Sequence, residues 1–290
     1  EYSVIIDTFD LPLRYDFEHY ELNETGKYQV FFEETQGTAL FKQYIWASGN
    51  SGFALTGVGR NPQEYPTVSI ENGIDGSRAI KLETKSTGQF GETVKMPIAA
   101  GNLFLGSFDV NNAVQKPLKA TRFGLPFGKK PLQLKGYYKY TPGTQPFKAK
   151  DKNGNTVTIP GQEDEGDIYA VLYEAAELDG KALDGNNVLT SENIVALARV
   201  EVEKKDEFTA FHVDFHYGSR IPIDWPKFIQ DQRDPSDDGT APYLSFSEEK
   251  MKNYEYNLAV VFTSSKYGAY FAGSVGSTLC IDKVEIVCEK

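Results

Sequence analysis

Short runs rich in aromatic and β-branched residues recur along the chain, each bounded by Gly, Pro, Asn or Asp. Such runs are typical of β-strands separated by turns. The segment FTAFHVDFHY shows the clearest two-residue alternation, with Phe211, Val213 and Phe215 on one face of the expected strand. The runs predict strands at 28–32, 79–84, 102–109, 132–140, 167–173, 194–202, 208–217, 256–264 and 277–287.

Two of these expected strands, IYAVLY at 168–173 and NLAVVF at 257–262, are apolar on both faces. A strand of this kind must be covered on both sides, as happens where two sheets pack together. The sequence therefore predicts an all-β fold, an antiparallel β-sandwich that is jelly-roll-like and carries long loops. We expect one domain over 15–290, preceded at 1–14 by a leader, an edge strand or the tail of an upstream domain.

Helical signals are scarce by comparison. The segment SEEKMKNYEY at 247–256 predicts one short helix, because Ser247 is placed to cap its first turn.

The last expected strand contains an acid among apolar residues. Strict alternation places Asp282 on an otherwise apolar face together with Cys280, Val284, Ile286 and Cys288. A buried carboxylate without a partner costs several kcal/mol or changes its protonation state. We therefore expect Asp282 to have a partner. The two cysteines would lie about 27 Å apart on this strand, too far for a disulfide.

Charge and hydropathy narrow the classes of partner. The formal net charge is −11, and an acidic surface disfavours nucleic acid and anionic lipid as partners. Apolar stretches such as 168–173 are too short to span a bilayer. The chain begins at Glu1 without an initiator Met or a signal peptide, so we expect its targeting information to have been removed.

Motifs for catalysis are weak in this sequence. His212 and His216 would lie about 13 Å apart on one strand face, too far to share a metal directly. No zinc spacing, phosphate-cradling glycine motif or Gly-x-Ser-x-Gly elbow occurs. Hydrolysis of a glycosidic bond needs two carboxylates about 5–10 Å apart, and the 41 acidic residues single out no pair. The acidic runs at 163–167 and 231–238 are interpreted as solvated loops.

Aromatic side chains are the better candidates for a binding site. Rings stack on the apolar face of a sugar while nearby polar groups bond its hydroxyls. Trp46 precedes a Gly/Asn/Ser-rich turn, Trp225 lies between prolines, and Tyr267 and Tyr270 occupy a Gly-rich loop. Arg122 offers a guanidinium fork. Core packing is the alternative interpretation for each ring, and a surface ion pair is the alternative for Arg122.

Six blocks of sequence, in this order, resemble the putative carbohydrate metabolism domain family, abbreviated PCMD. The blocks are SRAIKLET (77–84), GNLFLGSFD (101–109), RFGLPFGKKPLQLKGYYKYTPG (122–143), DIYAVLYE (167–174), NIVALARVEV (193–202) and SSKYGAYFAGSVGSTLCIDKVEI (264–286). The resemblance extends over most of the chain from about Asp16, and its most specific parts are FGLPF…KP…GYYKY and GSTLCID.

Domains of this family look like β-sandwich carbohydrate-binding modules and tend to occur in exported lipoproteins of gut bacteria that degrade glycans. The resemblance thus implies an exported protein of the cell surface or periplasm, lipid-anchored in its full-length form. It also implies outer-membrane glycan-uptake proteins as partners.

The resemblance further implies a partner for Asp282. In calcium-containing sugar-binding sandwiches, an aromatic–Glu pair on the first strand and an Asp on the last strand hold one structural Ca²⁺. Here Glu18 follows an aromatic residue and Asp282 lies on the last strand. The loop at 72–79 would complete the shell through Asp75 or nearby carbonyls.

One departure from the pattern and one alternative interpretation weigh against this calcium site. Lys283 follows Asp282 where such modules commonly carry a second acid. Backbone amides or Lys81 would also satisfy Asp282 without a metal.

Three functions stay open. The leading hypothesis is a non-catalytic domain that binds a poly- or oligosaccharide. The second is a glycoside hydrolase-like enzyme that uses an unidentified carboxylate pair, with at least one raised pKa. The third is a structural or adhesive surface protein that binds another protein. This last function predicts an exposed apolar patch or a long unprotected edge strand.

Overall fold

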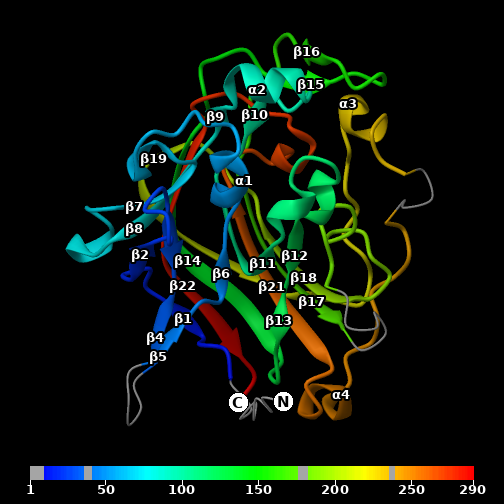
Figure 1. The fold of residues 1–290 in the computed structure, drawn as a ribbon. Coiled ribbons are helices and arrows are strands. Elements are labelled where there is room, and N and C mark those ends of the chain that lie inside the picture. The colour runs from blue at the N-terminus through cyan, green and yellow to red at the C-terminus, as the bar shows by residue number, and fades with distance from the viewer. Residues whose placement is uncertain (1–9, 36–40, 176–181, 235–238) are drawn as a thin grey trace, which may run out of the picture.

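The structure, a computed structural model, describes residues 10–35, 41–175, 182–234 and 239–290. Two large antiparallel sheets face each other, which confirms the predicted β-sandwich. Figure 1 shows β14 and β22 in one layer and β17 and β21 in the other. Most of the expected leader at 1–14 lies outside the described residues.

The six-stranded sheet runs in the order β19–β14–β22–β8–β7, and β1 pairs with β22. The first described strand thus lies beside the last one. The strands of this sheet are β1 (Arg14–Tyr15), β7 (Thr67–Ile70), β8 (Ala79–Glu83), β14 (Pro131–Thr141), β19 (Lys205–Asp214) and β22 (Thr278–Cys288).

The eight-stranded sheet runs in the order β12–β11–β21–β17–β18–β20, with β6 paired to β11 and β13 paired to β21. Its strands are β6 (Trp46–Ala47), β11 (Asn102–Phe108), β12 (Thr121–Phe123), β13 (Leu125–Pro126), β17 (Asp167–Glu174), β18 (Ile194–Val200), β20 (His216–Tyr217) and β21 (Tyr256–Thr263).

Strand β17 shows why a strand that is covered on both sides has two apolar faces. All eight of its residues are buried. Ile168 and Leu172 face the core between the two sheets, whereas Tyr169 and Tyr173 belong to a second apolar cluster on the outer face of the eight-stranded sheet. Loops and short helices cover that outer face, and this covering layer holds the candidate site.

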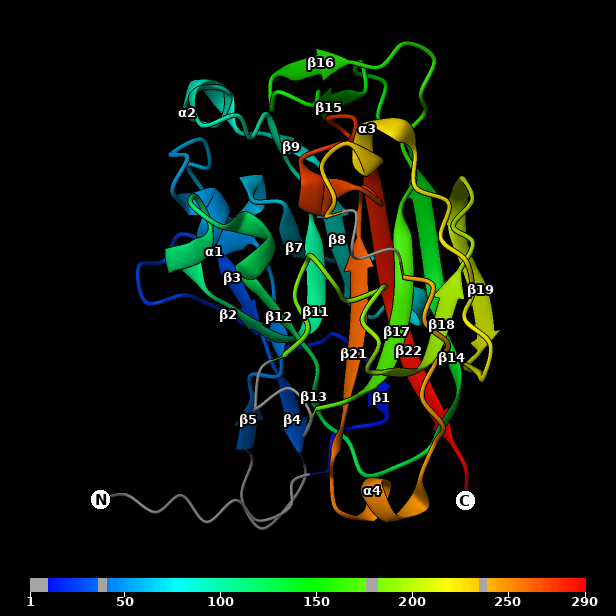
Figure 2. The ribbon, with the colours of Figure 1, turned by 90° about the vertical axis from the view of Figure 1, so that its right-hand side faces the viewer.

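The helices and 3₁₀ turns of the described residues are all short, and some of them belong to this covering layer. The helices are α1 (Asn50–Ala54), α2 (Gly88–Thr93), α3 (Lys227–Gln230) and α4 (Glu248–Lys252). Single 3₁₀ turns are η1 (Pro62–Glu64), η2 (Ile74–Gly76), η3 (Val110–Asn112), η4 (Pro117–Lys119) and η6 (Gly268–Tyr270). In Figure 2, α1 and α2 lie to the left of β11 and β21, and α3 lies above the upper end of β21.

The predicted helix at 247–256 is present as α4. Ser247 is its N-cap, and the Ser247 hydroxyl accepts a hydrogen bond of 3.3 Å from the Lys250 amide. None of the helices in the described ranges is long and apolar enough to cross a membrane.

Four two-stranded hairpins complete the described fold. They are formed by β2 (Tyr20–Leu22) with β3 (Gln29–Phe31), β4 (Glu33–Thr35) with β5 (Phe41–Gln43), β9 (Lys85–Ser86) with β10 (Ile98–Ala99), and β15 (Lys148–Lys150) with β16 (Thr156–Thr158).

Strand β22 does not alternate strictly, so the predicted shared face of Asp282 and Val284 was wrong. The register with β14 shifts between Lys135 and Tyr137, and Lys283 has a φ of 46°. This is a β-bulge, in which one extra residue reverses the faces of the strand. Ile281 and Val284 both face the core between the sheets. Asp282 consequently points away from that core.

Candidate functional site

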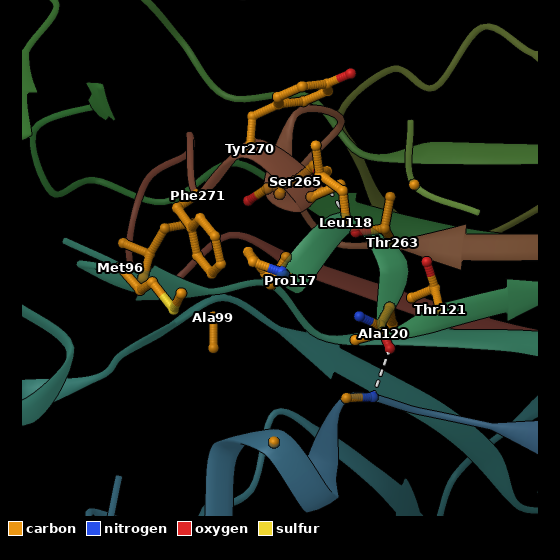
Figure 3. Close-up of a pocket in the computed structure, with 18 of the residues that line it drawn as sticks. Met96, Ala99, Pro117, Leu118, Ala120, Thr121, Thr263, Ser265, Tyr270 and Phe271 are labelled. Atoms are coloured by element: carbon orange, nitrogen blue, oxygen red, sulfur yellow. Dashed lines mark hydrogen bonds between the residues drawn. The ribbon is translucent and has the colours of Figure 1, made fainter. Parts of the chain in front are cut away.

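A pocket of about 200 Å³ lies on the outer face of the eight-stranded sheet. Phe104, Tyr169 and Val261, from three neighbouring strands, contribute to its lining. The covering layer supplies the rest, from α1, α2, η4, η6 and the segment at 185–189. Figure 3 shows residues of η4 and η6 meeting above the sheet.

One end of the pocket carries an aromatic cluster built around Arg233. The Arg233 guanidinium carbon lies 4.2 Å from the centre of the Trp225 ring. Its Nη1 donates a hydrogen bond of 2.8 Å to the Tyr270 hydroxyl. Trp225 also packs against Tyr267 and Tyr270, with ring centres 6.4 Å apart in each pair. We call these four residues the Trp225 cluster.

The structure therefore brings together three of the predicted aromatic residues. Trp225 and Tyr270 line the pocket directly, and Tyr267 packs against Trp225 without lining the pocket itself. Trp225 is half-buried, whereas Tyr270 is 7% exposed. The sequence did not single out Arg233, because it lies in an acidic run that was interpreted as solvated.

Asp167 and Arg199 form an ion pair next to this cluster. Arg199 donates from Nε and Nη2 to the two carboxylate oxygens of Asp167, at 2.9 and 2.6 Å. Burial acts to lower the pKa of Arg199, but the charge and hydrogen bonds of Asp167 raise it overall. Asp167 is the one carboxylate among the described residues that line the pocket. Its charge is compensated within the protein.

The other end of the pocket is apolar. Its lining comes from α1, α2, the segment after α2, the end of β11 and the segment after η3, and consists mainly of Phe53, Phe90, Val94, Met96, Phe108 and Val114. Figure 3 shows Met96, Pro117, Leu118 and Phe271 around the pocket, with the ring of Tyr270 beyond them.

Trp46 is a core residue, so its prediction as a sugar-stacking residue was wrong. It is 4% exposed and packs against Tyr15 and Phe17, at 5.0 and 5.4 Å between ring centres. Its Nε1 donates a hydrogen bond of 2.8 Å to Glu33. Trp46 begins the short strand β6, and pairing with β11 directs its ring between the sheets.

Arg122 lies on β12 but does not line the pocket. Its Nη2 donates a hydrogen bond of 3.0 Å to Asp109, and the side chain is 56% exposed. Arg122 therefore forms a surface ion pair, as the alternative interpretation expected.

Asp282 is covered by the loop that contains η2. Its Oδ2 accepts hydrogen bonds from the Ile74 amide at 2.6 Å and the Ser77 hydroxyl at 2.9 Å, and its Oδ1 accepts one from the Lys283 amide at 2.7 Å. A Cβ on Gly73 would lie 2.5 Å from Oδ2, so the loop can approach this closely only with glycine there. Burial raises the pKa of Asp282 despite these donors.

The same loop contacts Glu18, the second acid of the expected calcium site. Glu18 accepts a hydrogen bond of 3.0 Å from the Arg78 amide. Asp75 does not join the two acids, because its side chain is 86% exposed and pairs with Lys283 at 3.0 Å. In the ranges that the structure describes, no three His, Cys, Asp or Glu residues form a metal-binding group.

Oxygen ligands of the kind that Ca²⁺ prefers are thus present at Glu18, Asp282 and Ser77. Amide donors already bond both carboxylates, as the alternative without a metal expected. Lys81 takes no part in this, because it pairs with Glu83. The binding of Ca²⁺ by these residues is still a prediction.

The interpretation of 163–167 as a solvated loop was wrong. Asp164 and Asp167 are each 3% exposed. Asp164 accepts hydrogen bonds from the Ser265 and Ser277 hydroxyls and the Ser274 amide, at 2.6, 2.7 and 2.7 Å. Burial raises the pKa of Asp164 to about 6. The serine-rich run at 264–277 was the available signal that an acid would be bonded there.

These features define a β-sandwich with a pocket on its outer face, partly aromatic and partly apolar. The family model of the putative carbohydrate metabolism domain matches residues 16–287. The chain belongs to this family, as the sequence blocks indicated.

Two solved structures share this fold. The crystal structure of a putative glycoside hydrolase from Bacteroides thetaiotaomicron VPI-5482 is 41% identical, with a TM-score of 0.78 over 97% of this chain and 72% of that one. That of a putative glycoside hydrolase from Bacteroides vulgatus ATCC 8482 is 34% identical, with a TM-score of 0.75 over 97% of this chain and 99% of that one. Among curated proteins, none matches this chain.

Proposed function

We propose that this protein binds an oligo- or polysaccharide without cleaving it, and that the Trp225 cluster is the sugar-contacting part of its pocket. Membership of the carbohydrate metabolism family supports a carbohydrate-related role. The observation that carries the proposal is the arrangement of the half-buried Trp225 ring, the Tyr270 hydroxyl and the Arg233 guanidinium at one end of one pocket. A ring face for stacking and polar groups for hydroxyls are what sugar recognition requires.

Hydrolysis is the second candidate, since the two similar structures are named putative glycoside hydrolases. A glycosidase of the common kind needs two carboxylates that flank the bond to be cleaved. The described lining offers Asp167 alone, and Arg199 holds both of its oxygens. This arrangement favours binding over catalysis.

A glycan array followed by isothermal titration tests the proposal. We expect binding of at least one glycan, with no released products after long incubation of the same glycan with the protein. Release of products that is abolished in Asp167→Asn would show that the protein is a hydrolase. Absence of binding across a broad panel would count against both functions.

We also propose that the protein is exported and tethered at the cell surface, where it would act with outer-membrane glycan-uptake proteins. This proposal is supported by the family resemblance and by the Bacteroides origin of the two similar structures. Cell fractionation and protease treatment of intact cells test it. Recovery of the full-length protein in the cytoplasmic fraction would contradict it.

A further inference from the structure

The pocket is more apolar than binding of an unmodified sugar requires. A sugar needs one or two ring faces and several hydrogen-bond partners for its hydroxyls. The end away from the Trp225 cluster is lined by Phe53, Phe90, Met96 and Phe108 together with aliphatic residues.

The threonine hydroxyls at this end donate their protons within the protein. The Thr56 hydroxyl donates a hydrogen bond of 2.7 Å to the Phe53 carbonyl, and the Thr87 hydroxyl donates to the Met96 carbonyl. A sugar hydroxyl placed here would lose water without finding a threonine proton to accept, which is unfavourable. An alkyl or aryl group would instead gain from leaving water.

Exposed apolar side chains gather on the elements that form this end. Nine large hydrophobic residues are exposed among those that the structure describes, and five of them lie on or next to α1, α2 and η3. These five, Leu55, Val58, Phe90, Val110 and Val114, are 36–47% exposed, and we call them the apolar rim. An apolar grouping of this kind on a protein with a net charge of −11 is typical of a binding surface.

Close contacts join the elements that carry the rim. A Cβ on Gly88 would lie 3.0 Å from Val58, and a Cβ on Gly52 would lie 3.1 Å from the Phe108 ring. Phe90 and Val114 belong to the rim and also line the pocket. The rim is therefore continuous with the pocket that ends at the Trp225 cluster.

From this continuity we propose that the ligand is an amphiphilic glycoconjugate, a saccharide that carries an apolar alkyl, acyl or aryl group. The sugar contacts the Trp225 cluster, and the apolar group enters the end bounded by Phe90 and Val114. This inference rests on the proposed carbohydrate function and names the class of ligand for that site.

Fluorescence of N-phenyl-1-naphthylamine tests the apolar end separately from the sugar end. We expect one equivalent of this neutral probe to bind with enhanced emission. Val114→Asp should weaken its binding at least tenfold, because a charge would replace an apolar contact. Val114→Thr keeps the size and shape of the side chain and should weaken binding less. Leu22→Asp, which changes a leucine that is 48% exposed on β2 and lies outside the lining, should have no effect.

Glycosides with different aglycones test the link between the two ends. For a sugar that the glycan array identifies, the octyl glycoside below its micellar concentration should bind at least tenfold more tightly than the methyl glycoside. It should also displace the probe. Val114→Asp should remove this advantage of the octyl glycoside over the methyl glycoside.

Several outcomes would overturn the inference. One is that the probe does not bind. Another is that Leu22→Asp weakens probe binding as much as Val114→Asp does. A third is that the octyl and methyl glycosides bind equally tightly. Probe binding without any glycan binding would show an apolar site and refute the carbohydrate function. A concentration-dependent dimer that Val114→Asp dissociates would show that a second copy covers the rim.

Discussion

The Trp46 indole donates a hydrogen bond of 2.8 Å to the Glu33 carboxylate, which is 9% exposed. Burial raises the pKa of Glu33 to about 7, although this hydrogen bond acts to lower it. Glu33 therefore takes up a proton at a higher pH in the folded protein than a carboxyl group in water does. The hydroxyl of Tyr15, also buried there, has no hydrogen-bond partner in the described part of the chain.

Glu33→Gln should therefore flatten the dependence of stability on pH. Because the pKa of Glu33 is higher in the folded than in the unfolded state, the folded state binds more protons, and stability falls as pH rises from about 4.5 through 7. We expect Glu33 to account for about 3 kcal/mol of this loss, so the variant should lose less by that amount, whereas the contribution of the raised pKa of Asp164 is present in both proteins. Urea unfolding between pH 4.5 and 8.5 measures it, and parallel profiles for the two proteins would contradict the prediction.

Asp164→Ala should destabilise the segment at 264–277, which carries Tyr267 and Tyr270. The substitution leaves two serine hydroxyls and the Ser274 amide without their buried acceptor. We expect a loss of about 2–4 kcal/mol in the free energy of unfolding. Hydrogen exchange should be faster in 264–277 than in β14. Asp206→Ala removes an exposed acid and serves as the control.

Much of the fold could be predicted from local pattern, because a strand with two apolar faces must lie between two layers. Strands β17 and β21 follow that rule, and Ser247 caps α4 as expected. The bulge at Lys283 could not be predicted in this way. Alternation contains no information on where one strand gains a residue relative to its neighbour.

The site was only partly predictable, for a related reason. Trp225, Tyr267 and Tyr270 were found because glycine and proline placed them in loops. Trp46 was misjudged because a loop-like sequence context also surrounds β6, whose partner β11 is distant in sequence. The role of Arg233 could not be predicted, because its contacts with Tyr270 and Trp225 form only in the folded structure.

Trp225→Ala should weaken glycan binding about tenfold or more, since the exposed part of this ring is the proposed stacking face. The ring also packs on Arg233, so the variant is to be compared by circular dichroism and thermal unfolding. Tyr44→Ala is a suitable control, because Tyr44 is 50% exposed and does not line the pocket. Equal affinities of the two variants, measured by titration with the same glycan, would exclude Trp225 from the site.

Calcium, if it binds at Glu18 and Asp282, should stabilise the protein by mass action, because a metal that binds only the folded state raises its stability. We expect millimolar Ca²⁺ to raise the melting temperature by several degrees after treatment with EDTA, and Mg²⁺ to do so less. Glu18→Gln should abolish the effect, because the glutamine side chain lacks the negative charge that binds Ca²⁺. The glutamine oxygen can still accept the hydrogen bond from the Arg78 amide, so the loop should keep this contact. Asp75→Asn should not alter it, since Asp75 pairs with Lys283 at the surface.

Melting temperatures that are identical in EDTA and in Ca²⁺ would exclude a stabilising calcium site. Asp282 would then be satisfied by the Ile74 and Lys283 amides and the Ser77 hydroxyl alone. In that case Ser77→Ala should destabilise the protein by about 1 kcal/mol, because it removes one of these donors. If Ca²⁺ instead binds there, the Ser77→Ala loss should be larger in Ca²⁺ than in EDTA, since the substitution would also remove one of the oxygen ligands of the metal.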